Sequence, residues 1–377
     1  MKKHKGYPLL HINKEKIYEN AKRVVELCRT SGIGVSGVIK GVNGIEGIAE
    51  EFMRAGCAQI ASSRLEQLME IRKHHGEIET MLLRIPMKSE INDMIKHVDL
   101  SLNSERETVE LIEKACEKHH RDHKVILMMD LGDLREGFFD PEELFDLAIH
   151  IEKNMKHTKL AGVGTNLGCY GSVKPTAKNL GDLCHMAERI EQAIGRKLEF
   201  VSGGATSSLP LLMSGEMPKG VNNLRIGEAI LLNMDLPEIW HVDLGGMNQE
   251  TFTLKAQIVE IKEKPSYPVG ELFIDAFGHL PEYHDRGVRK RALLALGKQD
   301  FAMEDKLVPV DSKVEIIGSS SDHMIVDIED SPHCYHVGDI MEFRMFYGPM
   351  LHLCSSEWVR KAYFDKKTTE KGGNLHE

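Results

Sequence analysis

Short apolar runs alternate with helical patterns through more than half of this chain of 377 residues. The runs typical of strands lie at 34–40, 58–62, 80–85, 98–102, 124–130, 158–164, 198–202 and 223–226. The amphipathic helical patterns lie at 14–32, 45–55, 64–74, 89–96, 104–118, 141–154 and 175–195. Strands that alternate with helices in this way over about 200 residues predict a (β/α)8 barrel of the TIM type. A doubly wound open sheet is the alternative.

Local signals place some of the helix starts. Asn13 is a suitable cap for the helix at 14–32, and Asp140 followed by Pro141 suits the start of another. The segment Ser104–Glu107 has the Ser-x-x-Glu pattern of a capping box. These signals support the helical half of the predicted alternation.

The pattern changes after about residue 240. Alternating or continuous apolar runs lie at 253–261, 292–296, 314–317, 324–328 and 340–343, with polar or Gly- and Pro-containing turns between them. This pattern predicts a barrel domain at 12–240 and an all-β domain at 241–377. The strand-like run at 7–12 can pack with the second domain.

Composition excludes several classes of function. A net charge of -10 argues against general nucleic-acid binding, and no apolar stretch is long enough to span a bilayer. The seven cysteines are scattered without a CxxC pair, which favours reduced thiols in the cytoplasm. No histidine or cysteine spacing fits a zinc site, so no metal is expected.

Lys40 follows the first strand-like run directly and is followed by the small loop Gly41–Gly44. In a (β/α)8 barrel, chemistry is concentrated at the carboxyl ends of the strands. The alternative for Lys40 is a strand-end lysine that extends into solvent. Polar segments follow four other strands in the same way: Arg135, Asn166, Ser202–Ser208 and Arg225–Ala229.

Two of these segments suit an anion. Gly203, Gly204, Thr206 and Ser207 precede an apolar helical stretch, so their N–H groups and hydroxyls would lie at a helix N-terminus. Gly227 opens the next helix, and the loops after strands 7 and 8 are a common phosphate site in this fold. The alternative is that these residues only form turns and caps.

A reactive lysine and a phosphate site in one barrel mouth suggest pyridoxal 5'-phosphate, held by its phosphate and by a Schiff base with Lys40. Arg225 is suitably placed to meet the pyridine nitrogen. Because an arginine only donates hydrogen bonds, it would leave that nitrogen unprotonated. This limits electron withdrawal and favours simple removal and return of an α-proton.

The chain resembles fold-type III pyridoxal-phosphate enzymes of the alanine racemase family, and most of all the ornithine racemase-like branch. The resemblance extends from about residue 8 to about residue 363. It is carried by five segments: Val38–Gly44, Arg135–Phe138, Ala205–Ser207, Arg225–Gly227 and Gly318–Asp327. It implies a homodimeric amino-acid racemase that acts on a free amino acid such as ornithine or lysine.

The resemblance also implies roles for residues. Lys40 would hold the cofactor and act as the first base. The remaining cofactor contacts would come from Asn166, Thr206, Ser207, Arg225, Gly227 and Glu228. The substrate would be held by Arg135, Ser321 and Asp322. Glu136 and Glu228 could complement a cationic side chain, or Glu228 could favour a helix N-terminus.

The chain departs from the family pattern at several positions. Gly44 stands where the family has a tyrosine that binds phosphate, Asn166 where it has a histidine, and Met128 where it has a lysine that supports the arginine. The family's catalytic tyrosine of the β-domain is replaced by Lys298. Candidates for the second base are therefore Lys298, Tyr283 and His284, and the alternative for Lys298 is a surface lysine.

Two rival functions follow from the same residues. A non-catalytic pyridoxal-phosphate carrier or homeostasis protein would fit the missing tyrosine, but such proteins typically lack a C-terminal β-domain. A decarboxylase or aldolase of related architecture is the other rival. Decarboxylation would benefit from an acidic group at the pyridine nitrogen, whereas Arg225 offers the opposite.

Overall fold

The computed structural model describes residues 6–364 except 44, 46, 279 and 281. Gly44, one of the departures noted above, therefore lies outside the described residues. The chain forms two compact units. One contains Ile17–Asn248, and the other combines the residues up to Lys16 with those from Gln249 onward.

The first unit is a closed barrel of parallel strands in the order β2 to β9, with β9 paired to β2. The strands are β2 (Gly34–Val38), β3 (Gln59–Ser62), β4 (Glu79–Leu82), β5 (Leu100–Asn103), β6 (His123–Met128), β7 (Thr158–Gly164), β8 (Phe200–Ser202) and β9 (Asn223–Ile226). The predicted (β/α)8 barrel is confirmed, and the closure of the sheet excludes the doubly wound alternative.

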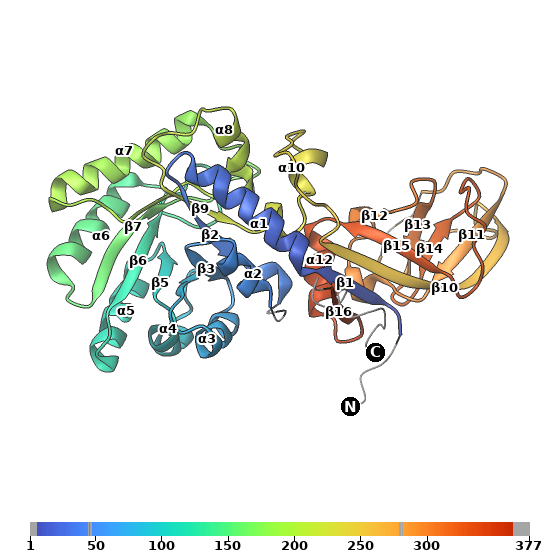
Figure 1. The fold of residues 1–377 in the computed structure, drawn as a ribbon, viewed down its shortest axis with the longest axis horizontal. Coiled ribbons are helices and arrows are strands. Elements are labelled where there is room, and N and C mark those ends of the chain that lie inside the picture. The colour runs from blue at the N-terminus through green and yellow to red at the C-terminus, as the bar shows by residue number, and fades with distance from the viewer. Residues whose placement is uncertain (1–5, 44, 46, 279, 281, 365–377) are drawn as a thin grey trace. The chain divides into compact units, whose positions relative to one another are not determined.

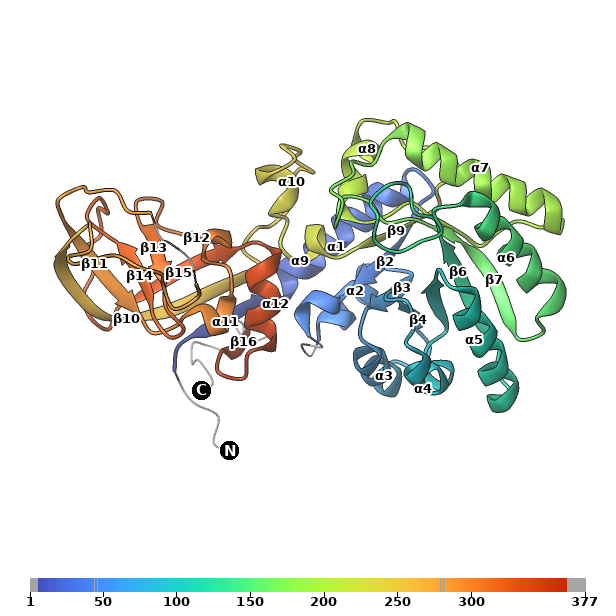
Figure 2. The same ribbon diagram turned by 180° about the vertical axis from the view of Figure 1, so that it is seen from behind.

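Helices surround these strands (Figures 1 and 2). They are α1 (Lys14–Arg29), α2 (Ile48–Arg54), α3 (Leu65–His74), α4 (Ile91–His97), α5 (Arg106–His119), α6 (Pro141–Asn154), α7 (Ala177–Ile194), α8 (Leu209–Met213), α9 (Glu228–Leu231) and α10 (Asp235–Glu238). Shorter 3-10 turns are η1 (Lys40–Val42), η2 (Lys88–Glu90) and η3 (Thr206–Ser208). Within the described residues, no helix is both long and apolar enough to cross a membrane.

Two of the three predicted helix caps are confirmed. Asn13 Oδ1 accepts a hydrogen bond from Lys16 N at 3.0 Å, and Asp140 Oδ1 accepts one from Glu142 N at 2.9 Å. The predicted capping box at Ser104–Glu107 is wrong. The cap position of α5 is Glu105, and its side chain makes no capping hydrogen bond. The Ser-x-x-Glu pattern is one residue out of register with the helix.

The strand-like run at 34–40 is shorter in the structure than predicted. Strand β2 ends at Val38, and Lys40 begins the 3-10 turn η1. The turn is followed by Asn43 in the left-handed conformation, with φ of 46°. Lys40 therefore lies in a turn just beyond the strand end, and its side chain is half-buried.

The second unit contains one sheet with the order β12-β15-β10-β11-β14-β13, extended by β1 beside β10 and by β16 beside β1. Its strands are β1 (Leu9–Asn13), β10 (Phe252–Pro265), β11 (Val288–Leu294), β12 (Leu307–Pro309), β13 (Glu315–Ser319), β14 (Met324–Asp327), β15 (Ile340–Met345) and β16 (Arg360–Phe364). The unit also has α11 (Lys298–Phe301), η4 (Glu304–Lys306) and α12 (Tyr347–Ser355), which the prediction of an all-β domain did not include.

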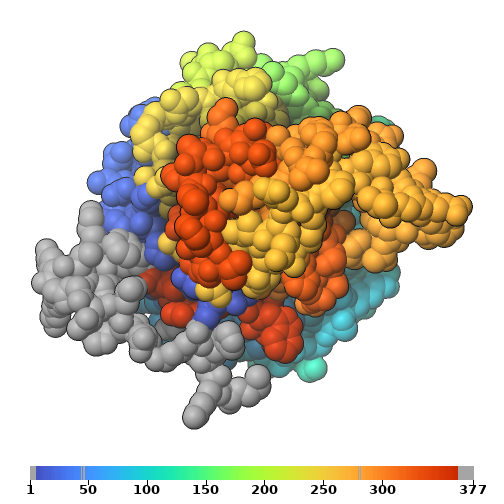
Figure 3. Space-filling view, turned by 90° about the vertical axis from the view of Figure 1, so that its right-hand side faces the viewer, coloured from blue at the N-terminus to red at the C-terminus, as the bar shows by residue number. Residues whose placement is uncertain are grey.

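Strand β1 is antiparallel to β10 and parallel to β16, so residues from both ends of the chain complete the sheet. The long strand β10 joins the two halves of the sheet, because it pairs with β15 near its start and with β11 near its end. The yellow-orange residues in Figure 3, which include β10 and the segment after it, form an exposed part of this unit's surface.

Candidate active site

Lys40 lies at the carboxyl end of the barrel strands, beside cationic neighbours. Burial lowers the pKa of its ammonium group, and the positive charges of Arg135 and Arg225 lower it further. The charges of Cys169 and Glu136 act in the opposite direction. The predicted residues Arg135, after β6, and Arg225, on β9, are thus within electrostatic range of the Lys40 amine.

Arg225 is almost completely buried on β9, with 5% of its surface exposed. Its Nη1 donates to Ser202 Oγ at 2.5 Å and its Nη2 donates to the Thr165 carbonyl at 2.6 Å. Among the described residues it has no carboxylate in ion-pair contact. Burial therefore lowers the pKa of Arg225 to about 10, which still leaves the guanidinium charged at neutral pH.

The turns after β8 and β9 are joined by a hydrogen bond. Thr206 Oγ1, in η3, accepts from Ala229 N in α9 at 3.2 Å. Ser207 Oγ donates to the Leu167 carbonyl at 2.7 Å. In the part of the chain that the structure describes, the backbone N–H groups of Ser207 and Gly227 have no hydrogen-bond acceptor. Both turns therefore offer N–H donors that an anion could use.

The Glu228 side chain binds the backbone at the start of α10. Its carboxylate is buried, and Oε1 accepts hydrogen bonds from Met234 N at 2.8 Å and Asp235 N at 3.0 Å. Burial and the nearby Asp235 raise the pKa of Glu228 to about 7. Oε1 thus caps the start of α10, while Oε2 is buried without a hydrogen-bond partner among the described residues.

Asn166, in the loop after β7, has an unused hydrogen-bond donor. Its Nδ2 atom is buried and has no partner among the described residues. An unpaired buried amide nitrogen is costly, so a bound group with an acceptor oxygen would satisfy it. Among the predicted cofactor contacts, Asn166 thus has a buried amide donor that lacks an acceptor.

Arg135 lies in the loop after β6 and is held by two neighbours. Nε and Nη2 donate to the two carboxylate oxygens of Glu136, and Nη1 donates to Cys169 Sγ at 2.9 Å. Met128, at the end of β6, offers Arg135 no polar contact, because it belongs to the apolar cluster of the barrel. The Glu136 carboxylate accepts from Nε and Nη2, and Cys169 accepts from Nη1, so one N–H group on each Nη atom remains for a ligand.

Asp133 joins the loop that carries Arg135 to the loop after β7. Its carboxylate accepts from the N–H groups of Cys169 at 3.4 Å, Tyr170 at 3.1 Å and Val173 at 3.1 Å. Burial alone would raise the pKa of Asp133, but these backbone hydrogen bonds outweigh it and lower the pKa. A Cβ on Gly171 would lie 2.5 Å from the Asp133 carbonyl oxygen, so the loops approach too closely for a side chain there.

The candidates for a second base all lie in the second unit. Lys298 begins α11, where its Nζ is 3.2 Å from Glu304 Oε1 and 4.3 Å from the centre of the Phe277 ring. Its side chain is 19% exposed, which is low for the surface lysine of the alternative interpretation. Tyr283 and His284 are exposed and lie before β11.

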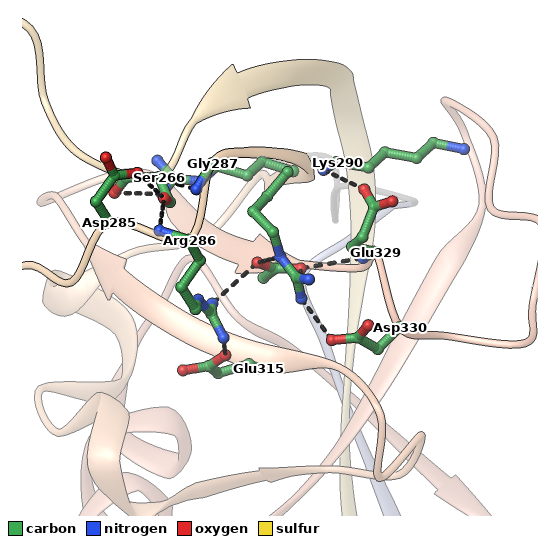
Figure 4. Close-up of polar contacts among 11 residues, drawn as sticks. Ser266, Asp285, Arg286, Gly287, Lys290, Glu315, Glu329 and Asp330 are labelled. Atoms are coloured by element: carbon green, nitrogen blue, oxygen red, sulfur yellow. Dashed lines mark hydrogen bonds and ion pairs between the residues drawn. The ribbon is translucent and has the colours of Figure 1, made fainter.

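The segment after His284 is fixed by polar contacts (Figure 4). Arg286 N donates to Ser266 Oγ at 2.5 Å, and Gly287 N donates to Asp285 Oδ1 at 2.9 Å. The Arg286 side chain pairs with Glu315 at 2.8 Å. The backbone just beyond Tyr283 and His284 is thereby held against the sheet.

The structure brings Ser321 and Asp322 next to the turn that carries Lys298. Lys298 N donates to the Ser320 carbonyl at 2.9 Å, and Gln299 Nε2 donates to Asp322 Oδ1. Ser321 Oγ donates to Asp322 Oδ2 at 2.7 Å. The segments 298–299 and 320–322, which are distant in the sequence, therefore form one cluster within this unit.

Some residues of the barrel site were not predicted from sequence. The sequence pattern indicates no role for Asp133, Thr165 or Cys169. The only signal for Asp133 was its place in a loop after a strand, which many surface aspartates share. Among the residues that the structure describes, no group of three or more His, Cys, Asp or Glu side chains could hold a metal ion.

Comparisons with known proteins agree with this fold. The family model for the N-terminal domain of alanine racemase matches residues 12–233. Ornithine racemase of Acetoanaerobium sticklandii is 42% identical over 94% of this chain and 99% of its own. Lysine racemase of Thermotoga maritima is 39% identical over 95% of this chain and 98% of its own.

A solved structure extends the likeness to the whole fold. Alanine racemase from a D-cycloserine-producing Streptomyces lavendulae has a TM-score of 0.73 and 16% identity, and the match covers 98% of this chain and 100% of that one. At that identity the match bears on the fold alone. The family match and the two relatives of near-equal length lead to one conclusion: this chain belongs to the alanine racemase family.

Proposed function

We propose that the protein is a pyridoxal-phosphate-dependent racemase of a free diamino acid, with Lys40 as the lysine that binds the cofactor. The observation that carries the proposal is the shared neighbourhood of Lys40 and Arg225. Strands β2 and β9 are paired, and a Cβ on Gly227 would lie 3.1 Å from the Val38 carbonyl oxygen. The amine, the buried guanidinium and the turns with unpaired N–H groups thus occupy one barrel mouth.

The donors present fit this cofactor. The N–H groups of Ser207 and Gly227 and the Thr206 hydroxyl suit a phosphate, and the orphaned Asn166 Nδ2 suits an oxygen on the ring. Glu228 would add its backbone N–H. Arg225 would meet the pyridine nitrogen as a donor only. Bound through its aldehyde to an amino group, pyridoxal phosphate supplies an electron-withdrawing ring that acidifies the proton on the substrate's α-carbon.

Racemisation needs a proton acceptor and donor on each face of the α-carbon. Lys40 would accept and donate the proton on one face, and its lowered pKa suits this role. The second group would come from the β-sheet unit of the other subunit of the proposed homodimer, where Lys298, Tyr283 and His284 are the candidates. Arg135 would hold the substrate carboxylate through its outer Nη edge, with Ser321 and Asp322 as further candidate contacts.

We expect ornithine and lysine to be better substrates than alanine. Two relatives near 40% identity are named as racemases of these diamino acids, and Glu136 places a carboxylate near Lys40. The measurement is α-proton exchange into deuterated water for a panel of L-amino acids, followed by chiral analysis of the product. Equal rates for alanine and ornithine would contradict the assignment of a cationic side chain.

The same assay separates the rival functions. A carrier would bind the cofactor covalently and exchange no α-proton with any amino acid. A decarboxylase would release carbon dioxide from the same panel, and an aldolase would cleave β-hydroxy amino acids. The donor-only Arg225 favours the racemase over the decarboxylase, because the nitrogen that it meets stays unprotonated.

A homodimer is part of the proposal. The segment between β10 and β11 exposes a group of large apolar side chains: Val269 (91%), Phe273 (78%), Ile274 (53%) and Leu280 (73%). Such a concentration is typical of a protein interface. Sedimentation should therefore give a dimer mass, and Phe273→Asp should shift it toward monomer while Met213→Asp, at another exposed apolar residue, should not. A wild-type monomer would contradict this proposal.

A cytoplasmic setting is also proposed. All seven cysteines are free thiols, as expected in a reducing compartment. Free ornithine and lysine are small metabolites that a protein in that compartment would meet.

A further inference from the structure

A chain of buried hydrogen bonds begins at Arg225. Arg225 Nη1 donates to Ser202 Oγ at 2.5 Å, and Ser202 Oγ donates to Asn223 Oδ1 at 2.6 Å. Asn223 Nδ2 then donates to Ser36 Oγ at 2.9 Å. Asn223 and Arg225 are two residues apart on β9, so their side chains point to the same face. The chain thus leads away from the barrel mouth along that face.

The chain continues across β2, β3 and β4. Ser36 Oγ donates to Gln59 Oε1 at 2.8 Å, and Gln59 Nε2 donates to Glu79 Oε2 at 3.0 Å. Lys124 Nζ contacts Glu79 Oε1 and Glu199 Oε1, each at 2.8 Å. These last three side chains line a cavity of about 1050 Å³. The hydrogen-bond chain therefore connects the buried Arg225 with a charged, partly exposed end.

The two ends fix the direction of every hydrogen bond between them. An arginine can only donate, and a carboxylate paired with an ammonium group accepts. Each neutral group between Arg225 and Glu79 must therefore accept on the side of Arg225 and donate on the side of Glu79. This requirement also fixes which way the amides of Asn223 and Gln59 face. Hydrogen bonds aligned in one direction polarise one another.

Burying the polar side chains of this hydrogen-bond chain inside the barrel costs free energy. Ser36 and Ser202 are 0% exposed, Asn223 is 2% exposed and Gln59 is 7% exposed. Barrel interiors are usually filled by branched apolar side chains, so polar side chains at these positions are unusual. Arg225 has no ion-pair partner among the described residues, and its charge depends on neutral acceptors. Polarisation toward Glu79 makes Ser202 Oγ a better acceptor for it.

We propose that Ser202, Asn223, Ser36 and Gln59 act as positioning residues that orient Arg225 and stabilise its charge, with Glu79 as the terminal acceptor. None of Asn223, Ser36 and Gln59 needs to touch the cofactor or the substrate. The inference rests on the proposed function, because the contact of Arg225 with the pyridine nitrogen is itself proposed.

The test compares two equally buried serines. Ser36→Ala interrupts this hydrogen-bond chain at Ser36, which is three hydrogen bonds away from Arg225. Ser101→Ala is the matched control, because Ser101 is also 0% exposed and hydrogen-bonded to His123 and Asn103, but has no link to Arg225. Two readouts are needed: kcat/KM for racemisation by the holoenzyme, and crystal structures of the cofactor-free variants. Glu79→Gln, at the cavity end, keeps the side chain's shape and serves as a second variant if Ser36→Ala does not fold.

We expect Ser36→Ala to lower kcat/KM roughly tenfold, as loss of an outer hydrogen bond commonly does, and to turn the Arg225 guanidinium away from Ser202 or Thr165. Glu79→Gln should lower kcat/KM several-fold, and Ser101→Ala should change neither readout. The proposal is overturned if Ser36→Ala matches Ser101→Ala in kcat/KM with Arg225 unmoved. If the wild type racemises no amino acid, the proposed function fails, and the position of Arg225 in the crystal structures still decides the inference.

Discussion

Lys40→Ala should abolish racemisation, with kcat/KM lower by at least about 10³-fold, because the substitution removes both the covalent attachment of the cofactor and one proton-transfer group. The rate of racemisation is measured from the optical rotation of L-ornithine. Cofactor attachment is measured by borohydride reduction of the holoenzyme and mass spectrometry of its peptides. In the wild type, the modified residue should be Lys40.

The matched control is Lys178→Ala, at an exposed lysine of α7. It should retain both the activity and the modification at Lys40. Racemisation of ornithine by Lys40→Ala at a rate near that of the wild type would contradict the role of Lys40. A modified lysine elsewhere would do the same.

The lowered pKa of Lys40 adds a pH dependence to this result. The uncharged amine is the reactive form, and a lower pKa increases its fraction at neutral pH. In the cofactor-free protein, acylation of Lys40 should therefore rise with pH and reach its midpoint below the ordinary lysine value of 10.5. The shift arises from burial and from the charges of Arg135 and Arg225, so Arg135→Gln should raise the midpoint.

The barrel could be predicted because each strand is a short apolar run closed by polar residues, and the runs recur between amphipathic helices. The same regularity placed Lys40, Arg135 and Arg225 at the strand ends. Side-chain direction within the loops could not be predicted in this way. The Glu228 carboxylate turns toward the backbone of Met234 and Asp235, and nothing in its sequence neighbourhood specifies that contact.

Contacts between distant segments were also hidden from the sequence. The chain from Arg225 to Glu79 joins residues on five strands, and each of them alone is an ordinary Ser, Asn, Gln or Glu. In the second unit, β12 has only three residues and α11 only four, which is too short for a periodic pattern to be distinguished. The capping box at Ser104–Glu107 failed for a related reason, since a local pattern does not fix the residue at which packing begins a helix.

Asp133→Asn should raise KM for ornithine about 100-fold with a smaller change in kcat. The substitution removes the charge that accepts from Cys169, Tyr170 and Val173 and places an amide donor against some of these N–H groups. Losing such hydrogen bonds to a charged group costs on the order of 3 kcal/mol. The loop would then withdraw the Cys169 thiol from Arg135, and the proposed carboxylate contact would lose one of its two supports. Steady-state kinetics measure the change.

Asp130→Asn is the matched control for this prediction. Asp130 Oδ1 also accepts two backbone hydrogen bonds, from Gly132 and Leu134, but both lie within its own loop. It should therefore raise KM much less than Asp133→Asn does. Because the folded-state pKa of Asp133 is lowered, the carboxylate's contribution is complete above its unfolded value of 3.8 and is lost only as the pH falls through the folded value. The effect of Asp133→Asn on KM should thus be constant between about pH 6 and 9, and a KM ratio that varied across this range would mean that Asp133 acts through a titrating partner instead of as a fixed anchor.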